Sequence, residues 1–123
     1  MDKAEQLIAS ILRETYENRI KWQVEDAPRI LTKSTENFYR SFYATRNPNS
    51  SGKIGIYDKS YKYYTDYDEF SWVDTLGICI LDSEDRITWS YEANSPSLFR
   101  LFETAREQTS GIDDLLNSFN LNK

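Results

Sequence analysis

The stretch from residue 75 to residue 81 constrains the possible fold more than any other part of this sequence. Its residues are Thr-Leu-Gly-Ile-Cys-Ile-Leu, so it is almost continuously apolar. Consecutive side chains of a strand point to opposite faces, and a strand of this composition is apolar on both. The two sets are Leu76, Ile78 and Ile80 on one face, and Gly77, Cys79 and Leu81 on the other. The run therefore predicts a central strand that is covered on both sides.

A hairpin is predicted directly after this strand. Residues 82–85 are polar and mostly acidic, which is typical of a turn. Residues 86–91 then alternate, with Ile87, Trp89 and Tyr91 separated by small polar residues. This period of two predicts a strand with one buried face that pairs antiparallel with the preceding strand.

Further short strands and three helices are predicted from the spacing of apolar residues. The strands are expected at residues 19–25, 30–33, 37–45, 53–58 and 61–64, with a loop at 47–52 and a turn at 58–60. The helices are expected at residues 2–17, 95–110 and 112–119. This order predicts an α+β fold in a single domain of residues 1–123. It has an N-terminal helix, an antiparallel sheet of about five to six strands, and one or two C-terminal helices packed on one face of the sheet.

The covering of the sheet leads to two further expectations. We expect the terminal helices to share one sheet face with Ile20, Trp22, Ile78 and Trp89, because each helix has one apolar stripe. The other face would then expose Cys79 and Leu81 beside tyrosines, and exposed apolar patches of this kind mark interfaces. A homodimer or larger assembly is therefore predicted on that face or on a tyrosine-rich sheet edge.

Composition and charge exclude several classes of function. The chain of 123 residues has a net charge of -5, and residues 57–85 hold eight acidic and two basic residues, which argues against direct nucleic-acid binding. There is no histidine, so catalytic triads and histidine-containing zinc sites within the chain are excluded. Cys79 is the single cysteine, which favours a reducing, cytoplasmic compartment, and we expect it to be an inert core residue. No secretory signal or membrane-spanning stretch is evident.

An aromatic and acidic stretch from residue 57 to residue 72 is the main candidate for a binding surface. Tyrosine and tryptophan provide large contact areas at low entropic cost, and the acidic residues suit a basic protein partner. The predicted contacts, to a protein partner or to a second copy, are Tyr57, Tyr61, Tyr63, Tyr64, Asp66, Tyr67, Asp68, Glu69 and Trp72. The alternative interpretation is ordinary strand aromatics beside a solvated acidic loop.

Two other kinds of site are compatible with the residue types present. An anionic, nucleotide-like ligand could be bound by Arg40, Arg46 and Lys53 together with stacked aromatic residues. A metal-dependent hydrolase could use the carboxylates Asp66, Asp68, Glu69 and Asp74. Their spacing lacks the tight-turn glycine of a calcium loop, so we predict no metal, no cofactor and no catalytic residue.

Three segments resemble a loose group of small, uncharacterised proteins of bacterial and phage type. They are Thr15 with Ile20-Lys21-Trp22, then Ser97-Leu98-Phe99-Arg100-Leu101-Phe102-Glu103-Thr104-Ala105, and Gly111-Ile112-Asp113-Asp114-Leu115-Leu116. The resemblance implies a bacterial or mobile-element origin, where many small acidic proteins regulate or neutralise a partner. The expected function is therefore a non-catalytic binding protein that regulates or inhibits a partner, of the immunity, anti-defence or antitoxin type. A small-ligand binder and a metal-dependent hydrolase are the alternatives.

Overall fold

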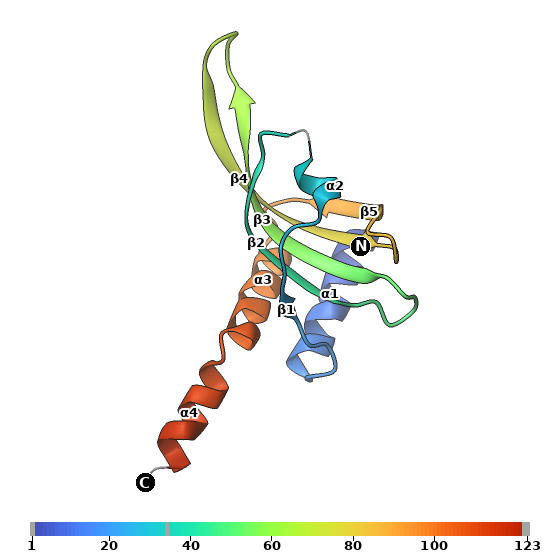
Figure 1. Ribbon diagram of the computed structural model, residues 1–123, viewed down its shortest axis with the longest axis vertical. Coiled ribbons are helices and arrows are strands. Elements are labelled where there is room, and N and C mark those ends of the chain that lie inside the picture. The colour runs from blue at the N-terminus through green and yellow to red at the C-terminus, as the bar shows by residue number, and fades with distance from the viewer. Residues whose placement is uncertain (1, 34, 122–123) are drawn as a thin grey trace.

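The computed structural model describes residues 2–33 and 35–121, and it has a mixed α+β architecture (Figure 1). Its elements in chain order are α1 (Lys3–Tyr16), β1 (Gln23–Val24), α2 (Arg29–Thr32), β2 (Phe38–Arg46), β3 (Lys53–Tyr64), β4 (Phe70–Leu81), β5 (Ile87–Glu92), α3 (Pro96–Thr109) and α4 (Ile112–Leu121). The strands of the described chain form one antiparallel sheet in the order β1-β2-β3-β4-β5. The predicted fold class is confirmed.

The hairpin of β3 and β4 forms the centre of the sheet, and both strands are longer than predicted. Each has 12 residues, and they pair along their whole length. The turn predicted at residues 58–60 is wrong, because Lys59 and Ser60 lie inside β3 and are buried. Residues 61–64 are therefore the end of β3 and not a returning strand. Polar residues are tolerated inside β3 because neighbouring strands provide hydrogen-bonding partners for them.

Helices α1 and α3 contact each other and cover one face of the sheet, where the larger hydrophobic cluster lies (Figure 1). Its buried members are Ile8, Ile11, Trp22, Tyr43, Ile54, Ile56, Ile78, Leu98, Leu101, Phe102 and Ala105. Ile20 and Trp89 are partly buried against the same cluster. The prediction that the N-terminal helix and a C-terminal helix share this face with these residues is confirmed.

The segment between α1 and β2 is held by a side chain of α3 and pairs little with the sheet. Gln108 accepts a hydrogen bond from the Trp22 backbone N–H at 2.6 Å and donates one to the Ile20 carbonyl at 3.0 Å. Because these backbone groups are occupied by Gln108, they are not available to a neighbouring strand. The strand predicted over residues 19–25 is accordingly reduced to Gln23–Val24.

The second face of the sheet is covered as well, which corrects the prediction that it is open. Cys79 is 0% exposed and Leu81 is 1% exposed. The second cluster consists of these two residues with Phe42, Ala44 and Tyr57, and Ala27, Leu31, Tyr39 and Ile87 pack against it. Part of the cover is α2, which replaces the strand predicted at residues 30–33 and follows Pro28, a residue that cannot donate to a strand ladder. Cys79 and Leu81 are therefore not available to a dimer interface.

Two parts of the molecule project from this two-sided core (Figure 1). One is the outer end of the β3–β4 hairpin. The other is α4, which follows Gly111, whose positive φ of 78° ends the preceding helical segment. The described side chains of α4 are exposed, including Leu115 and Leu116 at 55% and 53%. The core therefore ends at α3, and both projections present apolar side chains to solvent.

Candidate functional site

The candidate site is the outer end of the β3–β4 hairpin, residues 61–73, which we call the arm. The pairing of β2 with β3 ends at Phe38 opposite Ser60, and the pairing of β5 with β4 ends at Glu92 opposite Gly77. Beyond these points, the sheet consists of β3 and β4 alone. The arm therefore lacks the flanking strands and covering helices that bury the inner half of the same hairpin, and Figure 1 shows it extending away from the core.

A row of three aromatic side chains lies along one face of the arm. Tyr64 stands opposite Phe70, and Lys62 stands opposite Trp72, so the four side chains share that face. The ring centroids of Tyr64 and Phe70 are 5.7 Å apart, and those of Phe70 and Trp72 are 6.0 Å apart at a near-perpendicular angle. These distances are typical of favourable aromatic pairs, so the row is an ordered surface.

A lysine ammonium lies over this row. The Nζ of Lys62 is 4.5 Å from the ring centroid of Phe70 and 5.6 Å from that of Trp72. It also forms an ion pair with Glu36 at 3.4 Å, and the Tyr64 hydroxyl donates a hydrogen bond to the same carboxylate at 3.4 Å. The arm therefore already holds one cation against its aromatic face, which shows how a cation can be accommodated there.

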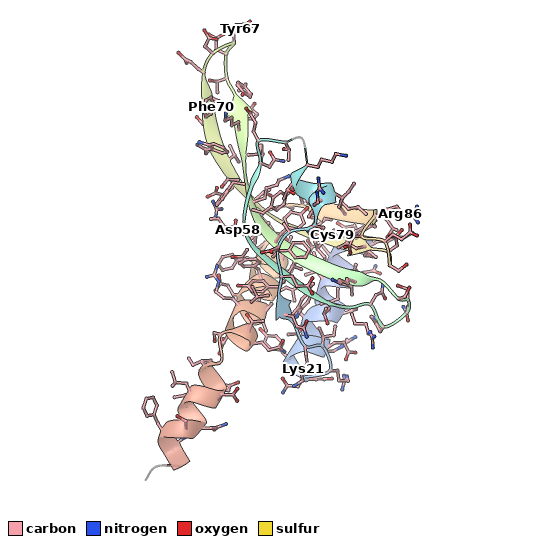
Figure 2. The ribbon with its side chains drawn as sticks, viewed as in Figure 1. Lys21, Asp58, Tyr67, Phe70, Cys79 and Arg86 are labelled. Carbon is pink, nitrogen blue, oxygen red and sulfur yellow. The ribbon has the colours of Figure 1, made fainter. Side chains whose placement is uncertain are left out.

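The tip and the opposite face of the arm are also exposed. Tyr67 at the tip is 92% exposed, and Tyr63 on the opposite face is 58% exposed. Figure 2 shows Tyr67 at the far end of the molecule, with Phe70 further down the arm. The acidic side chains of the tip are Asp66, Asp68 and Glu69, none of which forms an ion pair with another described residue. The tip therefore presents uncompensated negative charge beside exposed tyrosine.

Arg40 lies at the base of the arm. The sequence suggested that it binds an anionic ligand, but its charge is paired with two carboxylates of the hairpin. A bulge in β2 between Tyr39 and Ser41 makes Arg40 the extra residue, and bulges redirect side chains. Its guanidinium donates two hydrogen bonds to Asp58, at 2.6 and 3.1 Å, and lies 3.2 Å from Asp74. Hydrogen bonding to these carboxylates raises the pKa of Arg40. Arg40 therefore links β2 to the hairpin.

Tyr57 was predicted as a contact residue, but it is a core residue. It is 1% exposed, and its hydroxyl donates a hydrogen bond to Glu92 at 2.6 Å. The same carboxylate accepts two hydrogen bonds from the Lys59 ammonium, each at 2.8 Å. Burial, and then the hydrogen bond to Glu92, raise the pKa of Tyr57 well above its ordinary value. The ring fits because Gly77 opposite has no side chain.

The structure keeps the other predicted contact residues together and adds several that were not predicted. Tyr61 is partly buried at the root of the arm, whereas the predicted residues from Tyr63 to Trp72 are exposed. The added residues are Lys62, Phe70, Phe38 and Glu36. A shallow groove of about 400 Å³ is lined in part by Phe38, Glu36 and Trp72. Phe70 lies in the aromatic stretch of the sequence, but no sequence signal places Phe38 and Glu36 beside it.

The residues of the two alternative sites are separated. Arg46 and Lys53 lie opposite each other at the end of the β2–β3 ladder, whereas Arg40 is held at the base of the arm. Asp74 accepts a hydrogen bond from Ser60 at 2.5 Å, which with Arg40 lowers the pKa of its carboxyl, and it lies away from the acidic tip. Within residues 2–33 and 35–121, no three acidic or cysteine side chains are grouped as metal ligands would be. The carboxylate set of the hydrolase alternative is therefore not assembled.

Comparisons with protein families, with curated proteins and with solved structures find no match to this chain. The resemblance to small bacterial and phage-type proteins therefore stays a prediction from the sequence. In the described part of the chain, no helix combines the length and the apolar composition needed to cross a membrane.

Proposed function

We propose that this chain is a non-catalytic binding protein that contacts a protein partner through the arm. The observation that carries this proposal is that Tyr64, Tyr67 and Trp72 are 54%, 92% and 53% exposed on a projection of the sheet. Tyrosine and tryptophan side chains contribute strongly to binding energy when a partner removes them from water. Because these rings contribute little to the core, their large area is free to be buried by another molecule.

The proposed partner has a basic contact surface. The acidic residues Asp66, Asp68 and Glu69 at the tip lack ion-pair partners among the described residues, so they are available to a cation. The aromatic row below them already accepts the ammonium of Lys62, and the exposed ring of Tyr67 is open to stack on a partner arginine or lysine in the same way. Complementary charge of this kind steers association and selects partners.

Several features support a binding function over catalysis. The chain has no histidine, and its single thiol, Cys79, is fully buried, with a pKa that burial raises to about 11. A thiol in that state is protonated at neutral pH and is a poor nucleophile. We further propose, from the sequence resemblance, that the partner is a bacterial or phage protein that the chain regulates or inhibits in the cytoplasm.

Peptide selection tests this proposal and does not require the partner to be identified. A random peptide library is selected against the full chain, and the affinities of selected peptides are measured by calorimetry. We expect the peptides to be rich in lysine and arginine, and Trp72→Ala or Tyr67→Ala to weaken binding by about tenfold or more. Phe99→Ala is the matched control, because Phe99 is 56% exposed on α3 and should change affinity less than about twofold.

Two results would contradict the proposal. Selection of acidic or purely apolar peptides would contradict a partner with a basic contact surface. Equal losses of peptide affinity in Trp72→Ala and Phe99→Ala would place the contact outside the arm. A second copy that docked tip to tip would bring two acidic tips together, so we expect the arm to bind a foreign partner, and the homodimer predicted on a tyrosine-rich edge is the alternative outcome. Sedimentation equilibrium should therefore show a 14.5 kDa species at micromolar concentration. A dimer that Tyr67→Asp dissociates would show that the arm binds its own chain instead.

A further inference from the structure

A groove away from the arm collects positive side chains in a chain that is acidic overall. Its volume is about 680 Å³, and it lies between the segment after α1, strand β1 and the turn that joins β2 to β3. The basic residues that line it are Arg19, Lys21, Arg46 and Lys53, and Glu25 is the acidic residue of the lining. Figure 2 shows Lys21 far from Tyr67 at the tip of the arm. The groove is therefore a separate feature, and a ligand bound there is independent of the function proposed for the arm.

The charge of this groove is only partly neutralised by the chain. Arg19 forms ion pairs with two glutamates of the neighbouring helix end, and Lys53 lies 2.9 Å from one oxygen of Glu25. Lys21 and Arg46 are exposed, and neither side chain forms an ion pair with a described residue. Two full positive charges and one partly neutralised charge thus line the same concavity.

The arrangement of two of these cations works against stability. Arg46 and Lys53 stand directly opposite each other in the β2–β3 ladder, and like charges in that position repel. Lys53 is protonated at neutral pH, as an ordinary lysine is, and the hydrogen bond to Glu25 raises its pKa further. A neutral residue at position 46 would remove the repulsion, and no described acidic side chain relieves it at Arg46. This juxtaposition is what a bound anion would stabilise.

We propose that this groove binds a small anion that carries two or more phosphate groups. Lys21, Arg46 and Lys53 together with Glu25 leave about two net positive charges, spread over three cationic side chains, and this arrangement matches the spread charge of a di- or triphosphate better than a single phosphate. The turn adds Ser51, whose hydroxyl is a further hydrogen-bond donor beside Gly52. The volume falls within the range of about 300–1,000 Å³ that is common for small-molecule sites.

The lining also indicates which part of such a ligand is recognised. Ile20, Ala44 and Pro48 are the apolar residues of the groove, and none of its lining residues is aromatic. A nucleobase would therefore find no ring to stack on, in contrast to the nucleotide-like ligand with stacked aromatics that the sequence indicated. The groove selects for the phosphate groups, and a nucleoside triphosphate should bind no more tightly than inorganic triphosphate.

Calorimetry with the full chain at low salt tests this proposal. The probes are inorganic triphosphate, pyrophosphate, ATP, sulfate and a tetraglutamate peptide, compared at equal ionic strength. We expect triphosphate to bind most tightly, ATP to bind equally or less tightly, and Lys21→Gln or Arg46→Gln each to weaken triphosphate binding by about tenfold. Arg29→Gln is the matched control, because Arg29 is exposed on α2, lies outside the groove and carries the same charge.

The outcomes separate the proposal from its alternatives. Absence of binding by triphosphate, or equal losses in Arg29→Gln and Arg46→Gln, would overturn it, because the effect would then reflect net charge alone. Tetraglutamate that binds as tightly as triphosphate would show an acidic-peptide site and would overturn it as well. The melting temperature of ligand-free Arg46→Gln provides an independent readout. A melting temperature equal to or higher than that of the native sequence supports the proposal that the charge of Arg46 serves binding. A melting temperature clearly lower than that of the native sequence would show that Arg46 has a structural role and would contradict the proposal.

Discussion

The inner and outer halves of the β3–β4 hairpin are built from similar residues, but they have opposite environments. Tyr57 and Tyr63 belong to the same strand and, by alternation, to the same face, yet Tyr57 is 1% exposed and Tyr63 is 58% exposed. The inner half is flanked by β2 and β5 and is covered on both faces. The outer half has neither flanking strand. The role of a strand tyrosine is therefore decided by the layers around it and not by its residue type.

The same division separates structural polar contacts from functional surface. At the boundary between the halves, Arg40 ties Asp58 and Asp74 together on one face, and Lys59 binds Glu92 on the other. These pairs use the polar residues of β3 that resemble a turn in the sequence. Beyond them, exposed rings and unpaired carboxylates predominate. The hairpin is thus an anchored inner half that holds out an arm, and this contrast can be tested by substitutions in each half.

The largest difference in the free energy of unfolding is expected between substitutions of two tyrosines of β3. Tyr57→Ala should lower the free energy of unfolding by about 3–5 kcal/mol, because it removes a buried ring and leaves a cavity. Tyr63→Ala should change it by less than about 0.5 kcal/mol, because the ring is exposed. Urea denaturation followed by fluorescence measures both values. Comparable losses for the two variants would contradict the division of the hairpin.

Alkaline pH should destabilise the inner half through Cys79. Burial raises the pKa of this thiol from 9.0 to about 11, so the unfolded chain loses the proton at lower pH than the folded chain does. The stabilisation that the protonated thiol contributes is fully present below pH 9, and about 2 kcal/mol of it is lost as the pH rises from 9 to 11. The free energy of unfolding, measured from pH 8 to pH 11, should therefore fall more steeply in the native sequence than in Cys79→Ala. Equal slopes, or a native-state thiol that reacts rapidly with a disulfide reagent, would contradict the buried position.

Two ion pairs of β3 should also contribute unequally to stability, with the pair of the inner half contributing more than the pair of the arm. Lys59 is 9% exposed and binds Glu92, so Glu92→Gln should destabilise the protein by about 2 kcal/mol, because the lysine loses its counter-charge where water is scarce. Glu36→Gln, which weakens the pair of Glu36 with Lys62 in the arm, should cost less than about 0.5 kcal/mol, since that carboxylate is exposed. Thermal unfolding at pH 7 measures both. A larger effect at Glu36 would show that the arm is held by its ion pairs.

The fold class could be predicted from the sequence because the apolar periods of its main elements are clear. The run at residues 75–81 predicted a central strand covered on both sides, and the structure buries both of its faces. The open second face was a wrong prediction, because nothing local showed that the chain around Leu31 folds back as α2. The turn at residues 58–60 was also wrong, since its polar residues find partners in distant strands.

The candidate site could be predicted only as a stretch of sequence. Aromatic and acidic composition pointed to the residues around Tyr67, and the structure exposes that tip. Composition could not separate Tyr57 from Tyr63, because burial depends on where the flanking strands end. It also could not bring Lys21 beside Arg46, since the groove between them forms only when β1 pairs with β2.

The smallest effect on stability is expected in α4, the second projecting element. Leu116→Ala should change the free energy of unfolding by less than about 0.5 kcal/mol, because Leu116 is 53% exposed. Leu101→Ala in α3 is the matched comparison, because Leu101 is 0% exposed and should cost about 2–5 kcal/mol. Differential scanning calorimetry of the two variants distinguishes them. A large loss for Leu116→Ala would show that α4 packs on the core in solution.

Amide hydrogen exchange along β3 and β4 gives the sharpest test of the division between core and arm, because both halves of the hairpin are measured in one molecule. We predict that amides of the inner half, such as those of Ile56 and Ile78, exchange only with the free energy of global unfolding. The hydrogen-bonded amides of the arm should exchange at least about a hundredfold faster, through local opening that leaves the core intact. Protection in the arm equal to that of Ile56 and Ile78 would contradict this division, because the arm would then be part of the cooperative core.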